Sequence, residues 1–174
     1  MLDWPARFRE IIPSIDPDIV IVTFGGNDAQ GLSLPSGEFT IRDPVGEKAE
    51  WQAEYTRRAL EVLDILLEGG GRTVIWVGIP NDDNPDVTER MSVQDEAARA
   101  AVTQRPAVQF IDTWARFSGR SGGWAEYVVD PRDGVGKDVR AEDGFHLNET
   151  GAEILALDIA EAVEQDLRAR GSAI

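Results

Sequence analysis

Six apolar or β-branched residues follow one another in Ile19-Val20-Ile21-Val22-Thr23-Phe24, and the run ends abruptly at Gly25-Gly26-Asn27-Asp28. A strand with one face in solvent would alternate apolar and polar residues, whereas this run has almost no polar position. Uninterrupted apolarity predicts a strand that is buried on both faces, which is typical of a parallel sheet covered by helices. We therefore expect residues 19–24 to form a central strand.

The remaining segments continue the same pattern along the chain. Apolar runs predict further strands at residues 73–78 and 108–111. Helices are expected at about residues 4–12, 47–67, 92–103 and from 148 onward, with residues 31–46 and 118–143 as loops. Strands that alternate with helices predict right-handed crossovers and a parallel sheet. Three strands are few for such a sheet, so we expect the architecture to be incomplete on its N-terminal side.

The amino-acid composition excludes several classes of function. The chain has 174 residues, which fits one domain, and its 17 basic and 32 acidic residues give a net charge of −15. A field of this sign repels phosphate backbones and anionic lipids, so nucleic acid and membrane surfaces are not expected as partners. No stretch approaches the roughly 18 apolar residues of a membrane span. Cysteine is absent, which excludes disulfides and thiolate chemistry.

Two short motifs could carry chemistry. His146 is the only histidine, and Asp143 lies three residues before it. A carboxylate at this spacing can accept from one imidazole nitrogen and leave the other free to take a proton, although a lone histidine is also compatible with a structural role. Asn27 follows the first strand, where ligands of parallel sheets gather. Its amide could donate to an oxyanion, or the segment could be an ordinary turn.

These motifs resemble two sequence blocks of the SGNH (GDSL-type) hydrolase superfamily. Gly25-Gly26-Asn27-Asp28 is similar to its Gly-x-Asn-Asp block, and Asp143-Gly144-Phe145-His146 to its Asp-x-x-His block. The order of the blocks, their separation and their positions after a strand and before the last helix support the pairing. Surrounding segments resemble a bacterial branch of that superfamily: Asp3-Trp4-Pro5, Gly78-Ile79-Pro80, Phe110-Ile111-Asp112-Thr113-Trp114 and Arg140. The resemblance extends over nearly all of the chain.

The resemblance implies a three-layer α/β/α, flavodoxin-like fold with a parallel sheet. It also implies hydrolysis of acyl or acetyl esters by a Ser-His-Asp mechanism, with no metal and no cofactor. The substrate would be a small-molecule, carbohydrate or lipid ester. By this resemblance His146 is the catalytic base, Asp143 orients it, Asn27 donates to the oxyanion, and Gly25 is the glycine of the same block.

Two N-terminal blocks of the family are missing. The family's nucleophile lies in a Gly-Asp-Ser block, a second block supplies an oxyanion glycine, and this sequence lacks both. We therefore expect residues 1–174 to form a single domain that represents the C-terminal two-thirds of the fold and is inactive as given. Ser121 formally fits Gly-x-Ser-x-Gly, but the strand–turn–helix context that this motif needs is not predicted around it. The start of the chain lacks a signal-peptide pattern, which predicts a cytoplasmic protein, or a periplasmic or secreted one if a targeting segment is missing.

Two alternatives from other classes stay open. A non-catalytic binding or assembly module derived from the same fold would expose one edge of the strand at residues 19–24, and a free edge invites pairing into a homo-oligomer. The acidic stretch at residues 81–86 could instead belong to a metal-dependent phosphoesterase. It lacks the alternation of an EF-hand loop, and the chain has no second histidine. A solvated loop is the simpler interpretation of that stretch.

Overall fold

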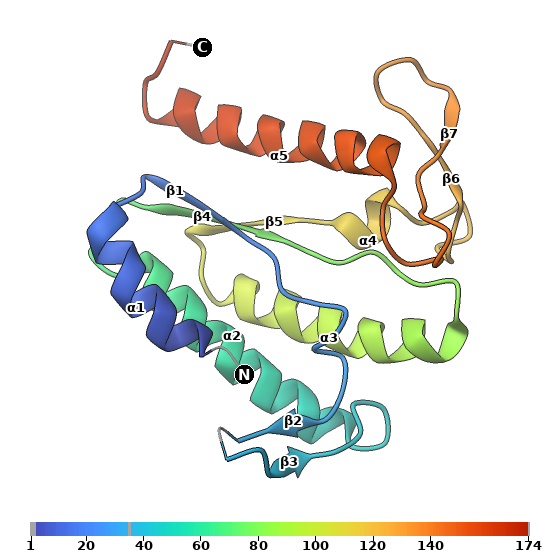
Figure 1. The fold of residues 1–174 in the computed structure, drawn as a ribbon. Helices are drawn as coiled ribbons and strands as arrows, with labels where there is room; N and C mark the ends of the chain where they lie inside the picture. The colour runs from blue at the N-terminus through green and yellow to red at the C-terminus, as the bar shows by residue number, and fades with distance from the viewer. Residues whose placement is uncertain (1–2, 35, 174) are drawn as a thin grey trace.

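Three parallel strands form the centre of the computed structural model, which describes residues 3–34 and 36–173 (Figure 1). They are β1 (Ile19–Val22), β4 (Thr73–Val77) and β5 (Val108–Ile111), in the order β1-β4-β5. Both pairings are parallel. The sheet and its direction agree with the prediction, since apolar strands joined through helices leave all strands pointing the same way.

Helices cover the sheet on both sides (Figure 1). The last helix, α5 (Glu149–Ala169), lies over one face. The opposite face carries α1 (Trp4–Ile15), α2 (Lys48–Leu67) and α3 (Pro85–Thr103). A short helix, α4 (Thr113–Arg116), follows β5. This is the predicted three-layer α/β/α arrangement. Among the described residues, no helix combines the length and the apolarity needed to cross a membrane.

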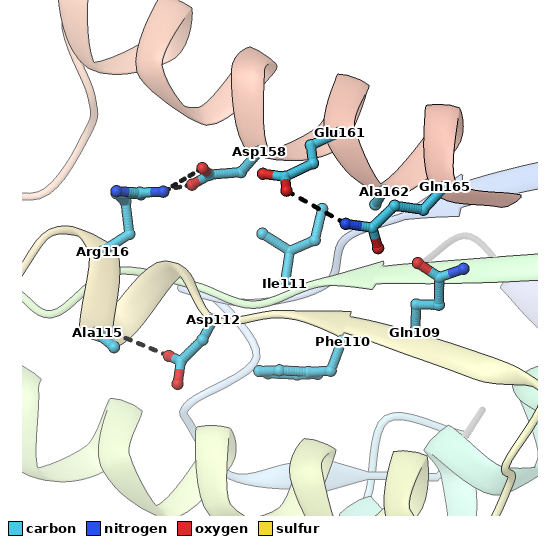
Figure 2. Close-up of a pocket in the computed structure, with 10 residues that line it drawn as sticks. All are labelled: Gln109, Phe110, Ile111, Asp112, Ala115, Arg116, Asp158, Glu161, Ala162 and Gln165. Carbon is cyan, nitrogen blue, oxygen red and sulfur yellow. Dashed lines mark hydrogen bonds and ion pairs between the residues drawn. The ribbon is translucent and has the colours of Figure 1, made fainter. Parts of the chain in front are cut away.

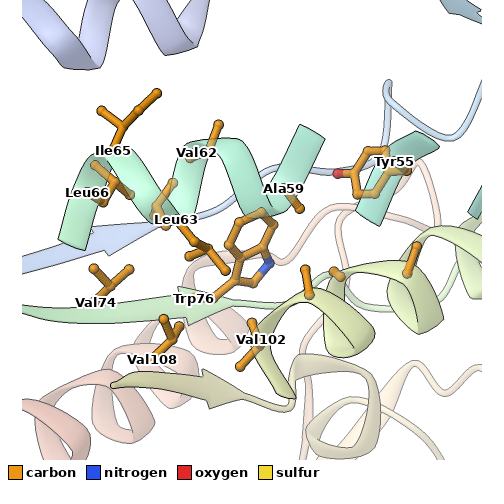
Figure 3. Packing of buried hydrophobic residues seen from close by; sticks show 14 of the residues in the cluster. Tyr55, Ala59, Val62, Leu63, Ile65, Leu66, Val74, Trp76, Val102 and Val108 are labelled. Carbon is orange, nitrogen blue, oxygen red and sulfur yellow. The ribbon is translucent and has the colours of Figure 1, made fainter. Parts of the chain in front are cut away.

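The larger part of the core lies between α2, α3 and the sheet. Leu63 and Leu66 of α2 are fully buried and pack near Val74 and Trp76 of β4 (Figure 3). All five residues of β4 are buried because the strand has a neighbour on each side and helices on both faces. Full burial of one large apolar side chain contributes about 1.5–3 kcal/mol. This central strand is therefore the most completely buried part of the sheet.

The prediction of a central strand at residues 19–24 is wrong. The strand ends at Val22 and lies at the sheet edge, where β4 is its only partner among the described residues. Ile21 is 49% exposed. Its neighbour Ile19 packs at the margin of the cluster beneath α5, which is centred on β4 and β5. An apolar run reports how its side chains are covered, but it carries no information on how many strands lie beside it.

Both predicted loop regions contain short antiparallel hairpins. Residues 31–46 hold β2 (Leu32–Ser33) and β3 (Phe39–Ile41), and residues 118–143 hold β6 (Tyr127–Val129) and β7 (Gly136–Asp138). Strands of two or three residues are too short to produce a detectable alternation of apolar and polar residues, so the sequence pattern misses them.

Helix α3 begins seven residues earlier than predicted. The Asn84 side chain accepts a hydrogen bond from the Asp86 amide (3.0 Å), and Pro85 occupies the first helical position. Both residue types favour a helix start. The first turns of α3 are acidic and largely exposed, so the apolar periodicity that predicts a helix begins only near Met91. The predicted acidic loop is therefore partly the first turns of this helix.

Candidate active site

A pocket of about 420 Å³ opens beyond the carboxyl end of β1. Three separate segments line it. The loop after β1 contributes Asn27, the first turns of α3 contribute Arg90, and the loop before α5 contributes His146. Ligands of parallel sheets bind at this end of the strands because the connecting loops converge there. The structure thus brings the predicted Asn27 and His146 to one cavity, and Gly25 lines it as well.

His146 and Asp143 form a close pair at the rim of this pocket. The Nδ1 atom of His146 lies 2.6 Å from Oδ2 of Asp143. The second carboxylate oxygen accepts from the backbone amides of Phe145 (3.1 Å) and His146 (2.9 Å). The hydrogen bond to the imidazole, helped by these two amides, lowers the pKa of the Asp143 carboxyl to about 2. An ionised Asp143 holds the proton on Nδ1, which leaves Nε2 as the basic nitrogen.

Arg140 holds the loop that carries His146 in place. Arg140 is buried, with 5% of its surface exposed. It donates to the carbonyl oxygens of Phe145 (3.0 Å), Asn81 (2.9 Å) and Phe117 (3.0 Å), and to the side-chain oxygen of Asn81 (2.8 Å). Burial lowers the pKa of Arg140 from its usual value. Because one of its partners is the residue directly before His146 and another is Asn81, Arg140 connects the His146 loop to the loop that follows β4.

Two further contacts complete this support. The indole nitrogen of Trp124 donates to the Gly144 carbonyl (2.7 Å). The Ala141 amide donates to the His146 carbonyl (2.8 Å). After this loop the Asn148 side chain accepts from the Gly151 amide (3.0 Å) and caps α5. The helix expected from residue 148 onward therefore begins as predicted, and the cap gives the His146 loop a defined end.

The turn that presents Asn27 depends on two glycines. Gly26 has φ of +71°, a conformation that side chains disfavour. A Cβ atom on Gly25 would lie 2.1 Å from Cγ2 of Ile79, so only glycine fits there. The Gln30 side chain donates to the Asn27 carbonyl (2.8 Å). Within the described ranges the Asn27 carboxamide itself makes no hydrogen bond, so its N–H groups are free for a ligand.

Next to this turn lies a polar cluster that the sequence analysis missed; its members Tyr55 and Gln94 are buried and Asp28 is exposed. The Tyr55 hydroxyl donates to Asp28 (3.4 Å) and accepts from the Gln94 side chain (2.8 Å). Desolvation raises the pKa of Asp28, and burial together with the neighbouring Asp28 raises the pKa of Tyr55. No spacing in the sequence signals this cluster, because its members come from three segments that only the fold brings together.

Other candidate residues lie apart from the pocket. Ser121 occupies an exposed turn between α4 and β6, with no strand directly before it and no helix after it. Asn81, from the acidic stretch, is fully buried against Arg140. Among the described residues that line the pocket, none carries a hydroxyl or thiol group. No group of three or more metal-ligating side chains occurs in the part of the chain that the structure describes.

A larger hollow of about 570 Å³ lies between β5 and α5 (Figure 2). Four of its polar side chains are paired with each other. Arg116 forms an ion pair with Asp158 (Nε to Oδ2, 2.6 Å), and Gln165 donates to Glu161 (3.2 Å). Groups that satisfy each other in this way leave little polar capacity for a ligand. We therefore take the smaller pocket beside His146 as the candidate active site.

Comparison with known proteins identifies the family of this chain. A family model described as "Protein of unknown function (DUF459)" matches residues 1–162. The chain belongs to this family. None of the curated proteins matches the DUF459 chain in sequence.

Solved structures with the same fold include two hydrolases. A GDSL-like lipase from Bacteroides thetaiotaomicron VPI-5482 is 15% identical, with a TM-score of 0.60 over 94% of this chain and 70% of that one. A lipase/acylhydrolase from Enterococcus faecalis is 19% identical, with a TM-score of 0.59 over 95% of this chain and 68% of that one. These matches confirm the predicted relationship of this DUF459 chain to the SGNH (GDSL-type) hydrolases at the level of the fold.

Proposed function

We propose that this chain provides the catalytic base and the oxyanion donor of an SGNH-type ester hydrolase. The observation that carries the proposal is the His146–Asp143 pair (Nδ1 to Oδ2, 2.6 Å), whose imidazole lines the same pocket as the unpaired carboxamide of Asn27. The fold shared with a GDSL-like lipase and a lipase/acylhydrolase supports it. The substrate is an acyl or acetyl ester of a small molecule, carbohydrate or lipid.

The chemistry assigns one step to each residue. Nε2 of His146 takes the proton of an attacking hydroxyl group while the oxygen bonds to the ester carbonyl carbon. Asp143 holds the imidazole by its Nδ1–H and stabilises the imidazolium that forms. The Asn27 amide donates to the carbonyl oxygen as it becomes negative. The imidazolium then gives its proton to the departing alcohol, the ester C–O bond breaks, and the acyl group stays on the attacking oxygen.

The attacking hydroxyl belongs, in this proposal, to a serine of the Gly-Asp-Ser type, and residues 1–174 contain no such tripeptide. A small alcohol can take its place in an assay. Without an added alcohol we expect the chain to be inactive on p-nitrophenyl acetate, but with methanol present it should form methyl acetate and p-nitrophenol faster than buffer does. His146→Ala should reduce the rate to that of buffer. Asp143→Asn and Asn27→Ala should each reduce it by roughly tenfold or more, because oxyanion and orienting groups act in the transition state.

The variants also separate this proposal from incidental reactivity. If His146 acted only as an exposed imidazole, the rate of methyl acetate formation would fall with His146→Ala but would not change with Asn27→Ala. Ser121→Ala serves as a control in a distant turn and should leave the rate unchanged. Equal methyl acetate formation by the parent and by His146→Ala, or a rate that falls with Ser121→Ala, would contradict the proposal.

A second candidate, an assembly module, is supported by the edge position of β1. Ile21 is 49% exposed there, and a free strand edge with apolar side chains favours pairing with another chain. Light scattering during size-exclusion chromatography should then give twice the monomer mass. Ile21→Lys should restore the monomer, because a lysine on an edge strand opposes pairing. A parent protein that is monomeric at high concentration counts against this candidate.

A further inference from the structure

An arginine stands beside the candidate catalytic pair. Arg90 lies in the second turn of α3, is half-buried, and lines the pocket together with His146 and Asn27. Its Nε atom donates to the Asp86 carbonyl of its own helix (3.3 Å). Within residues 3–34 and 36–173, its two terminal amino groups make no hydrogen bond, and no carboxylate oxygen lies within 4.0 Å of the guanidinium. The pocket therefore contains a cation with free donors.

This lack of a partner is unusual in so acidic a protein. With 32 acidic and 17 basic residues, carboxylates are plentiful, and most arginines have one, as Arg116 does with Asp158. Arg140 binds carbonyl oxygens instead. Among the described arginines, the side chains of Arg42, Arg90 and Arg120 contact neither a carboxylate nor a carbonyl oxygen of another element. Arg42 and Arg120 are exposed and lie outside the pocket. Of these three arginines, Arg90 is the one that lines the pocket beside His146.

We propose that Arg90 binds a carboxylate of the substrate, so that the pocket selects monoanionic esters. This inference rests on the proposed hydrolase function and specifies its substrate class. The planar guanidinium pairs with a carboxylate through two parallel hydrogen bonds, and a single positive charge balances a single negative one. A phosphate dianion would keep one uncompensated charge inside a protein whose net charge is −15. The carboxylate could sit on the acyl part or on the alcohol part of the ester.

Binding can be measured at His146 without turnover. Because the chain has one histidine, its imidazole gives one set of NMR signals that reports on this pocket alone. Four probes form two matched pairs: monomethyl succinate with dimethyl succinate, and O-acetyllactate with its methyl ester. The first pair places the carboxylate on the acyl part, the second on the alcohol part. In at least one pair the charged member should bind about tenfold more tightly than the neutral one.

Substitutions at Arg90 and at a matched site test the cause of that preference. Arg90→Gln should abolish the preference for the charged probe and leave the affinity of the neutral one unchanged. Arg90→Lys keeps the charge without the planar fork and should retain only part of the preference. Arg120→Gln makes the same change in net charge at an exposed site and should behave as the parent does.

Three results would overturn the proposal. They are equal binding of charged and neutral probes by the parent, a charge preference that survives Arg90→Gln, and the absence of any shift of the His146 signals with all four probes. Failure of the hydrolase proposal has a different signature. In that case methyl acetate formation does not depend on His146, while the charge preference still depends on Arg90.

Discussion

Arg140→Ala is expected to lower the free energy of unfolding by about 3–5 kcal/mol, because several buried carbonyl oxygens lose their hydrogen-bond donor. The guanidinium satisfies the carbonyl oxygens of Asn81, Phe117 and Phe145. Phe117 and Asn81 are fully buried, so water cannot replace the lost donors without rearrangement. Each buried polar group left without a partner costs about 1–3 kcal/mol. The loss also leaves a cavity beneath the His146 loop.

Urea denaturation of the parent and the variant measures this effect. Arg120→Ala is the matched control, since Arg120 is exposed and an isolated surface substitution changes stability by less than about 0.5 kcal/mol. The NMR signal of His146 gives a second readout, because the loop should lose its fixed position. If Arg140→Ala costs no more than Arg120→Ala, the carbonyl contacts do not stabilise the fold.

Trp51→Ala should destabilise the protein by about 3–5 kcal/mol, as is usual for a buried tryptophan. Trp51 has no exposed surface and stacks on Tyr55 with ring centroids 4.9 Å apart. Its indole nitrogen donates to the Gln30 carbonyl at 2.6 Å. Gln30 in turn donates to the Asn27 carbonyl, so one side chain connects the core of α2 to the turn that presents the proposed oxyanion donor.

Trp51→Phe separates packing from hydrogen bonding. It keeps most of the ring volume and removes the donor, so its cost should be only about 1–2 kcal/mol. Hydrogen exchange at residues 27–30 should nevertheless accelerate in Trp51→Phe, since the turn loses its anchor. Equal stability losses for the alanine and phenylalanine variants would show that the packed ring contributes little. Unchanged exchange in Trp51→Phe would contradict the connection to the turn.

The fold was predictable where a segment is both long and strongly patterned. The helix expected at residues 47–67 agrees with α2 to within one residue, and the apolar run at residues 73–78 predicts β4 to within one residue. The edge position of β1 in the sheet was not predictable. Apolar residues indicate that the side chains of a strand are buried, but they do not show how many strands pair with it. The start of α3 was missed because its first turns face solvent and are recognisable only by the Asn84 cap and Pro85.

The candidate site was predictable only in its motif residues. Asn27, Asp143 and His146 stand in short patterns that local chemistry can interpret, and the structure places Asn27 and His146 on one pocket. Arg90 carries no such pattern, since its lack of a partner is a property of the folded surroundings. Arg140 was noticed only through the family resemblance. Its contacts join three distant segments, and no sequence spacing encodes them.

The pocket walls come from segments that are far apart along the chain, and this has a consequence for assembly. Asn27 and His146 are separated by about 120 positions, so contact between their loops requires most of the topology to exist first. No short fragment can build the cavity. During refolding, the environment of the single imidazole should become native only in the final cooperative phase. The NMR signal of this ring should therefore report when the tertiary structure is complete.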